Sequence, residues 1–312
     1  MSPSARHEVR IGGYVPAVVT PFDAAGAIRY EDFRSIVRWL VDSGAQGICI
    51  AGDNGESWAL TPDERARLVR EAREAIGNRV PLALGASAAT TRQSIAYAEI
   101  AAREGADAIL LMPQTYVLKA TRAELVAHFR SVGRAVPLPI IAYNSPRRAG
   151  IAMSVDDIAA IVDMAPIVAL KESTRDFGHL SHVIRRLGER ISVMTGPASF
   201  VLPSIGLGAK GFISSGPELL GALASRVMTL GSRAPDAEYR AAHHALTRVY
   251  EMLMAIGTWP SALKAGLAMV GQPAGVPRDP VQPLGDDDRA KLAALLRELV
   301  PAPQGIASRA TA

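Results

Sequence analysis

The segments Ile140-Ile-Ala-Tyr-Asn-Ser-Pro146 and Ile167-Val-Ala-Leu-Lys-Glu-Ser173 decide how this chain folds. Each begins with a short run of apolar and β-branched residues, which is typical of a buried strand. Each strand ends in a reactive residue, Tyr143 in the first and Lys171 in the second. Between them, Ser154-Val-Asp-Asp157 is typical of a helix start. This order predicts a strand, a helix and a second, parallel strand.

The same alternation of short apolar strands and helical stretches runs along the chain. Helix starts are marked by two capping boxes, Thr61 to Glu64 and Thr121 to Glu124. We expect eight strands, at Tyr14–Thr20, Gly47–Ala51, Pro81–Gly85, Ala108–Met112, Ile140–Tyr143, Val168–Lys171, Ser192–Thr195 and Gly211–Ser214. Eight strand–helix units predict an α/β fold, a (β/α)8 TIM barrel, with a C-terminal helical extension.

The domain organisation follows from this pattern. We expect an N-terminal segment over residues 1–12, the barrel over 13–232 and a C-terminal helical region over 233–300 with three helices. The last residues, 301–312, are rich in Pro, Gly, Ser and Ala and predict a disordered tail. No change in composition marks a second independent domain, and barrels of this length form single domains.

Composition and charge exclude several classes of protein. The net charge of +4 is small for 312 residues, and basic and acidic residues are interspersed, so we expect no nucleic-acid partner. No apolar run is long enough to span a membrane, and the first residues predict no signal peptide. The single cysteine, Cys49, suits a reducing compartment. We therefore expect a cytoplasmic protein with no membrane partner.

The catalytic residues are expected where the barrel strands end, because the carboxyl ends of parallel strands meet at one face. A lysine at the end of an apolar strand is unusual, since burying an ammonium is unfavourable. The same burial lowers the pKa of a lysine and makes the amine a nucleophile toward carbonyls. A tyrosine next to it can carry the protons of imine formation. Lys171 and Tyr143 therefore predict covalent catalysis on a ketone or aldehyde, with no cofactor and no metal.

Several other motifs have simpler explanations. Gly206-Leu-Gly-Ala-Lys-Gly211 matches a dinucleotide-binding pattern but precedes a strand, so we discard it. The pairs His179 with His182 and His243 with His244 are predicted to be solvated helix residues and not metal ligands. Glu56 is predicted to cap backbone amides of its own loop, although a general acid is the alternative. Glu172 stays open between the same two roles.

The chain resembles the dihydrodipicolinate synthase and N-acetylneuraminate lyase family over Gly13–Leu299. The motifs that carry the resemblance are Pro16-Ala-Val-Val-Thr-Pro-Phe22, Gly52-x-x-Gly-Glu56, Tyr143-Asn-x-Pro146, Leu170-Lys-Glu-Ser173 and Gly211-Phe-Ile-Ser214. The resemblance implies a barrel with C-terminal helices, assembled as a homo-oligomer, a tetramer or a dimer. It also implies that Lys171 forms a Schiff base with pyruvate or another 2-oxo acid, and that Tyr143 relays protons.

The resemblance further implies a set of substrate-binding residues. A backbone group near Ile213 holds the keto acid, and Arg148 binds the carboxylate of a second substrate. The rule on strand ends adds Gly196, which follows the strand ending at Thr195 and lies at the same mouth. Asp53 and Asn54 stand where the family usually has hydroxyl residues that bind the keto acid's carboxylate. An ionised Asp53 about 4 Å from that carboxylate would repel it by roughly 4 kcal/mol at an effective dielectric near 20. Asp53 is therefore protonated, turned away or paired with an arginine, or the carboxylate lies elsewhere.

A second departure concerns the segment Pro113-Gln-Thr-Tyr116. In the synthases of the family, a tyrosine here crosses a subunit interface and completes the proton relay. Only Tyr116 is available in this chain, one position displaced, and its loop is lengthened. Tyr116 and Thr115 are the candidates for this part of the relay.

These residues leave four functions open. The first is a Schiff-base lyase that makes or breaks a carbon–carbon bond between a 2-oxo acid and an aldehyde. The second is a dehydratase or hydratase-aldolase acting on a sugar-derived or aromatic 2-oxo acid. The third is a non-catalytic barrel that binds a keto acid, and the fourth is a phosphate-binding barrel enzyme, suggested by the turns after Thr195 and Ser214.

Overall fold

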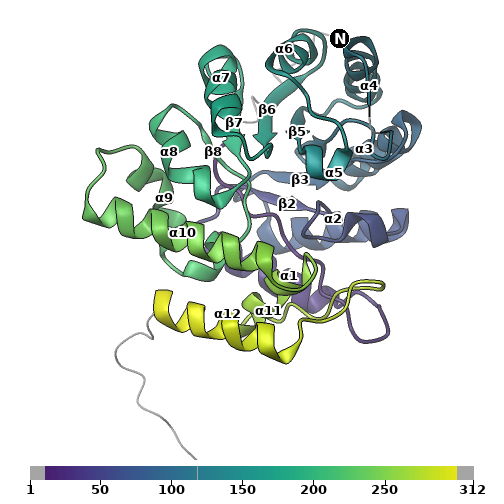
Figure 1. The fold of residues 1–312 in the computed structure, drawn as a ribbon. Coiled ribbons are helices and arrows are strands. Elements are labelled where there is room, and N and C mark those ends of the chain that lie inside the picture. Colours follow the sequence, from purple (N-terminus) through teal and green to yellow (C-terminus); the bar gives the residue numbers. More distant parts are fainter. Residues whose placement is uncertain (1–10, 118, 301–312) are drawn as a thin grey trace, which may run out of the picture.

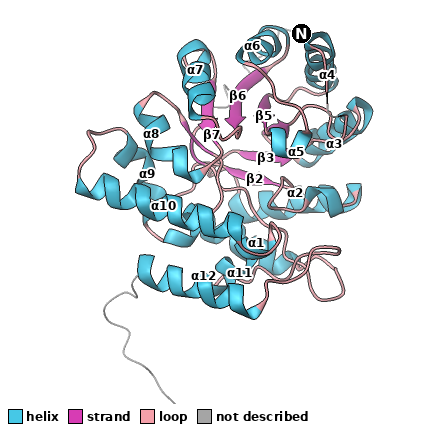
Figure 2. Ribbon diagram, viewed as in Figure 1, coloured by secondary structure: helices cyan, strands magenta, loops and turns pink. Residues whose placement is uncertain are grey.

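The computed structural model describes residues 11–117 and 119–300, and it is a (β/α)8 barrel. The expected tail and most of the expected N-terminal segment lie outside the described residues. The strands occupy the middle of the molecule and the helices surround them (Figures 1 and 2). The strands are β1 (Gly13–Tyr14), β2 (Ile48–Ile50), β3 (Leu82–Gly85), β4 (Ala108–Leu111), β5 (Ile140–Asn144), β6 (Ile167–Glu172), β7 (Ser192–Thr195) and β8 (Gly211–Phe212).

All neighbouring strands pair in parallel, in the order β1-β8-β7-β6-β5-β4-β3-β2. The segment after β1 joins the two ends of this sheet, because the Val18 amide donates to the Cys49 carbonyl at 2.8 Å and the Cys49 amide donates to the Pro16 carbonyl at 3.0 Å. The prediction of a continuous strand over Tyr14–Thr20 is wrong. Pro16 has no N–H to donate, so regular pairing stops at Tyr14 and resumes only as an isolated bridge at Ala17.

Helices follow the strands as the capping boxes predict. The side chains of Thr61, Thr121 and Ser154 each accept a hydrogen bond from the backbone amide three residues on. The barrel helices are α1 (Tyr30–Asp42), α2 (Pro62–Ile76), α3 (Thr91–Glu104), α4 (Arg122–Ala135), α5 (Pro146–Ala149), α6 (Val155–Met164), α7 (Phe177–Leu187), α8 (Val201–Gly206) and α9 (Leu223–Gly231). Three short 3-10 turns are η1 (Ser57–Ala59), η2 (Ala198–Phe200) and η3 (Pro217–Leu220).

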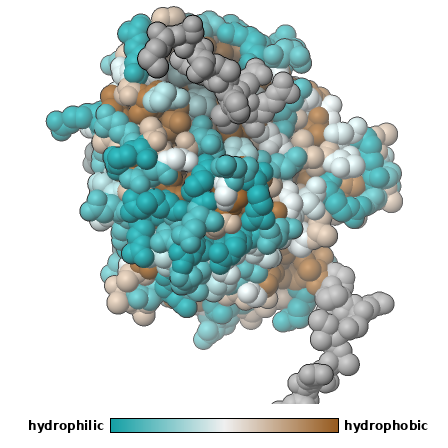
Figure 3. Space-filling view, turned by 180° about the vertical axis from the view of Figure 1, so that it is seen from behind, coloured by the Kyte–Doolittle hydropathy of each residue, from teal (hydrophilic) through white to brown (hydrophobic). Residues whose placement is uncertain are grey.

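The expected three C-terminal helices are present. They are α10 (Ala237–Ala255), α11 (Ser261–Met269) and α12 (Asp286–Leu299), and they lie together on one side of the barrel (Figure 1). The described helices include none with the length and apolar character needed to cross a membrane. The face shown in Figure 3 is mostly hydrophilic, with apolar residues in smaller patches.

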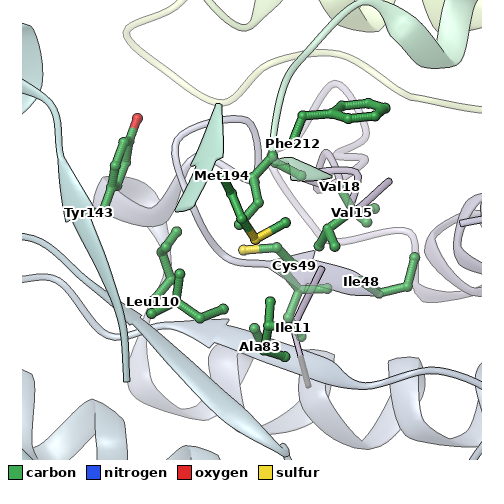
Figure 4. Packing of buried hydrophobic residues seen from close by; sticks show 14 of the residues in the cluster. Ile11, Val15, Val18, Ile48, Cys49, Ala83, Leu110, Tyr143, Met194 and Phe212 are labelled. Carbon is green, nitrogen blue, oxygen red and sulfur yellow. The ribbon is translucent and has the colours of Figure 1, made fainter. Parts of the chain in front are cut away.

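The barrel interior is filled by apolar side chains. Cys49, Leu110 and Met194 come from three different strands and are fully or almost fully buried against one another (Figure 4). The hydroxyl of Tyr143 points away from this cluster (Figure 4). The packed interior therefore closes one end of the barrel and leaves the strand ends at the other end for chemistry.

Candidate active site

Tyr143 and Lys171 lie side by side at the ends of adjacent strands. They are direct partners in the parallel register of β5 and β6. The Lys171 Nζ atom lies 4.2 Å from the centroid of the Tyr143 ring. Both side chains therefore reach the same point above the barrel core, although they are 28 positions apart in the sequence.

Burial shifts the Lys171 amine toward its neutral form. The residue is only 7% exposed, and burial lowers its pKa below the usual value of 10.5. The charge of Asp53 opposes this shift and that of Arg148 supports it. A lowered pKa increases the fraction of neutral amine, which is the form that adds to a carbonyl.

Asp53 connects Tyr143 to Arg148. Its Oδ2 atom accepts a hydrogen bond from the Tyr143 hydroxyl at 3.0 Å and another from Nε of Arg148 at 3.1 Å. Burial, followed by the charge of Asp53, raises the pKa of Tyr143 well above 10.0. Tyr143 is therefore a neutral phenol at neutral pH, already hydrogen-bonded to a proton acceptor.

These contacts answer the question that the sequence left open about Asp53. The structure shows that Asp53 is paired with an arginine. The arginine is Arg148, which the resemblance assigns to a substrate carboxylate. Because Arg148 already faces a carboxylate of this chain, its charge is partly neutralised before any substrate binds.

The side chain of Asn54 forms hydrogen bonds to other segments of this chain. Its amide donates to the Ala17 carbonyl at 2.7 Å and to Oγ of Ser215 at 2.8 Å, and its oxygen accepts from Nε1 of Trp259 at 3.1 Å. Both amide hydrogens are thus used within the chain. Asn54 holds the strand-end loop against the turn before α11, and a substrate would have to displace one of these bonds to reach its amide.

A cavity of about 390 Å³ opens over these residues. Seven of the nine residues predicted for the site line it: Asp53, Asn54, Tyr143, Arg148, Lys171, Gly196 and Ile213. The relay candidates Thr115 and Tyr116 are not among the lining residues of this chain. Tyr116 is 89% exposed, because its loop leaves the barrel after β4 and turns outward with a positive φ of 75° at this residue.

The cavity wall also contains residues that the sequence analysis missed. One group follows the ends of β5 and β6, where the rule on strand ends could have found it: Ser145, Arg147, Ser173 and Arg175. A second group comes from α10 and the turn before α11: Tyr250, Leu253, Met254, Gly257, Thr258 and Trp259. No sequence signal points to the second group, because it depends on how the C-terminal helices dock on the barrel.

Glu56 has a different role from the one predicted. Its carboxylate does not cap its own loop: Oε1 lies 2.5 Å from Nζ of Lys264, and Oε2 accepts from the Arg278 amide at 2.8 Å. Glu56 and Lys264 are 0% and 1% exposed. Burial lowers the pKa of Lys264 to about 8, although Glu56 acts in the opposite direction. The pair ties the loop that carries Asp53 to α11.

Removing one partner of this pair is expected to destabilise the fold strongly. Lys264→Met leaves the Glu56 carboxylate buried without its cation, which costs about 3–5 kcal/mol in the free energy of unfolding. Urea denaturation of the variant and of wild type measures the difference.

Two further variants test the cause. In the double variant Glu56→Gln with Lys264→Met, no buried charge is left unpaired and the Gln side chain still offers an acceptor to the Arg278 amide, so most of the stability should return. Lys291→Met removes an exposed pair with Asp288 and should change stability by less than about 1 kcal/mol. Equal losses in the single and double variants would show that Lys264 acts through packing alone.

Glu172 and His179 form a second buried polar contact behind the site. Glu172 Oε2 accepts from Nδ2 of Asn144 at 2.9 Å and lies 3.3 Å from Nε2 of His179. The hydrogen bond with Glu172 raises the pKa of His179 above 6.5. The prediction that His179 is a solvated helix residue is therefore wrong. None of these three residues lines the cavity, which gives Glu172 a supporting position.

Two kinds of site were not expected from the sequence, a dinucleotide-binding site and a metal site. The glycine-rich segment ending at Gly211 begins at the end of α8 and leads into β8, so it lacks the strand-to-helix context of a dinucleotide site. Within residues 11–117 and 119–300, no cluster of three or more His, Cys, Asp or Glu side chains could hold a metal ion.

Comparisons with known proteins agree with this architecture. The sequence model of the dihydrodipicolinate synthetase family matches residues 10–299. A 4-hydroxy-tetrahydrodipicolinate synthase of Synechococcus sp. is 32% identical, with 96% of this chain and 100% of that protein covered.

Two solved structures are similar over almost the whole fold. Dihydrodipicolinate synthase DapA-2 of Bacillus anthracis is 28% identical, with a TM-score of 0.89 and coverage of 95% of this chain and 100% of that one. A chloride-inhibited dihydrodipicolinate synthase of Acinetobacter baumannii in complex with pyruvate is 27% identical, with a TM-score of 0.87 and coverage of 93% and 99%. With a family match over nearly its whole length and a buried strand-end lysine beside a tyrosine, the chain belongs to the dihydrodipicolinate synthetase family.

Proposed function

We propose that the protein is a class I lyase that joins Lys171 to pyruvate or a related 2-oxo acid as a Schiff base, and makes or breaks a carbon–carbon bond by aldol condensation or cleavage. The observation that carries the proposal is the position of Lys171. Its amine is buried in the cavity, shifted toward the neutral form and adjacent to Tyr143. The related synthase of Acinetobacter baumannii, which was solved with pyruvate, supports the choice of a 2-oxo acid.

The first step uses the neutral amine. Nζ of Lys171 adds to the C2 carbonyl carbon of the 2-oxo acid, and the carbonyl oxygen takes up a proton. The resulting carbinolamine loses this oxygen as water, which carries away both protons of the original amine, and leaves the imine. An imine at C2 stabilises the carbanion at C3, which is the carbon that attacks an aldehyde or is released by cleavage.

Tyr143 and Asp53 are proposed to carry the protons. When Tyr143 takes a proton from a substrate oxygen, its own proton passes along the existing hydrogen bond to Asp53. The transfer avoids a free phenolate, which the raised pKa of Tyr143 makes unfavourable. The reverse movement returns the proton, and the ion pair with Arg148 holds the Asp53 carboxylate beside Tyr143.

A dehydratase acting on a sugar-derived 2-oxo acid is the second candidate, and Asp53 favours it. A carboxylate within this chain gives the relay its own proton acceptor and donor, without a tyrosine from another subunit. When the substrate loses a hydroxyl group, the leaving oxygen must receive a proton, and a relay with its own proton donor can supply it.

Trapping with borohydride tests the function directly. Pyruvate, longer 2-oxo acids and 2-oxo sugar acids are each incubated with the protein and borohydride, and the mass of the protein and of its peptides is measured. We expect one reduced adduct per chain on the peptide that contains Lys171. No adduct with any 2-oxo acid would rule out the Schiff-base mechanism.

Asp53→Asn is expected to separate binding from proton transfer. The amide oxygen can still accept one hydrogen bond from Tyr143 or Arg148, but the side chain can no longer hold the proton. Turnover of the best trapped substrate should fall by about two orders of magnitude, while borohydride trapping of pyruvate persists. Steady-state kinetics and trapping are measured on the same preparation. Turnover equal to wild type would assign Asp53 a purely structural part.

A further inference from the structure

The charges that line the cavity exceed what a simple keto acid requires. Four basic residues face it, Arg147, Arg148, Lys171 and Arg175, against a single acidic residue, Asp53. Asp53 is paired with Arg148, and burial favours the neutral form of Lys171. Two arginines are left, whereas pyruvate brings only one carboxylate.

Arg175 is held at the cavity wall by an unusual backbone and an uncharged partner. It lies in the turn between β6 and α7 with a positive φ of 62°, a conformation that is unfavourable for a non-glycine residue. Its Nη2 atom donates to the hydroxyl of Tyr250 in α10 at 3.1 Å. Tyr250 therefore positions the guanidinium across the cavity without neutralising its charge.

The surroundings of these two arginines leave their charges available. Among the described residues, neither Arg147 nor Arg175 takes part in a salt bridge, whereas Arg148 in the same cavity is paired with Asp53. A guanidinium binds a carboxylate through two parallel hydrogen bonds, a geometry that a neutral tail of a substrate cannot use.

We propose that Arg175, oriented by Tyr250 and supported by Arg147, forms a distal subsite for a second carboxylate, and that the 2-oxo acid bound at Lys171 is a diacid. The inference rests on the proposed imine at Lys171, which fixes the keto end of the substrate. The far end then lies along the wall formed by the turn after β6 and by α10. Arg148 contributes less to this recognition, because Asp53 already occupies its Nε.

A matched series of probes tests the subsite without requiring turnover. The series pairs 2-oxo diacids of four to seven carbons with 2-oxo monoacids of the same chain length, and borohydride trapping gives the half-saturating concentration of each. For the best length, we expect the diacid to be trapped at a concentration at least about tenfold lower than its monoacid partner. In Arg175→Gln, this ratio should fall to about one.

Two more variants separate recognition from structure. Arg175→Gly removes the guanidinium but suits the positive φ, so the diacid preference should vanish while the melting temperature stays equal or rises. Arg175→Lys should recover only part of the preference, because an ammonium lacks the paired donors. Arg190→Gln, which changes an exposed arginine outside the cavity, is the matched control and should keep the full preference.

The outcomes distinguish the two proposals. If pyruvate and every other probe fail to be trapped by wild type, the Schiff-base function is wrong. If pyruvate is trapped but diacids and monoacids of equal length are trapped equally, or if Arg175→Gly keeps the diacid preference, the function stands and the distal subsite is wrong.

Discussion

Lys171→Ala is expected to abolish both the borohydride adduct and turnover. Loss of a covalent nucleophile lowers kcat by up to about a millionfold, and Lys171→Ala removes the amine at which we propose that the imine forms. Intact-protein mass spectrometry after treatment with pyruvate and borohydride measures the adduct. The same preparations give the turnover of the best trapped substrate.

Lys210→Ala is the matched control, since it removes an exposed lysine from outside the cavity and should leave labelling and rate unchanged. An adduct that survives in Lys171→Ala would place the reactive amine elsewhere.

The rate of borohydride trapping is expected to rise with pH. Only the neutral amine reacts, so the initial rate of imine formation rises with pH through the pKa of Lys171 in the folded protein. Because burial places this pKa below 10.5, the rate should level off at a lower pH than for an ordinary lysine side chain. A rate that keeps rising to the pKa of a free lysine would show that the amine is solvated.

Tyr143→Phe is expected to slow turnover by about two to four orders of magnitude while the fold is kept. The substitution removes only the hydroxyl that donates to Asp53, and the ring that packs beside Lys171 remains. Steady-state kinetics, with circular dichroism as a check on folding, measures the effect.

Tyr97→Phe is the control, because it also removes the hydroxyl of a buried tyrosine. Tyr97 is also buried and its hydroxyl accepts a hydrogen bond from Gln93, but it does not line the cavity, so the rate should stay close to wild type. A Tyr143→Phe variant as fast as Tyr97→Phe would assign Tyr143 to packing.

The local features of the fold could be predicted from the sequence because they depend on neighbouring residues. The capping box at Thr61 and the apolar strand ending at Lys171 are encoded within a few positions, and the structure has both. The barrel rule then places all strand ends at one face, which brings Tyr143 and Lys171 together without further information. The expected strand Tyr14–Thr20 is interrupted by Pro16, a residue whose missing N–H could have been weighed. The expected strand Gly211–Ser214 is also too long, since β8 ends at Phe212.

The tertiary structure decided which charged side chains pair with one another. Asp53 and Arg148 are 95 positions apart, and nothing near either residue in the sequence selects the other. The same holds for Glu56 with Lys264 and for Arg175 with Tyr250, because each pair joins a barrel loop to a C-terminal helix.

The sequence by itself thus determined the barrel and the position of Lys171 beside Tyr143, since strand ends converge in any parallel barrel. The tertiary structure decided the partner of Asp53 and the far wall of the cavity, since these depend on how distant segments pack.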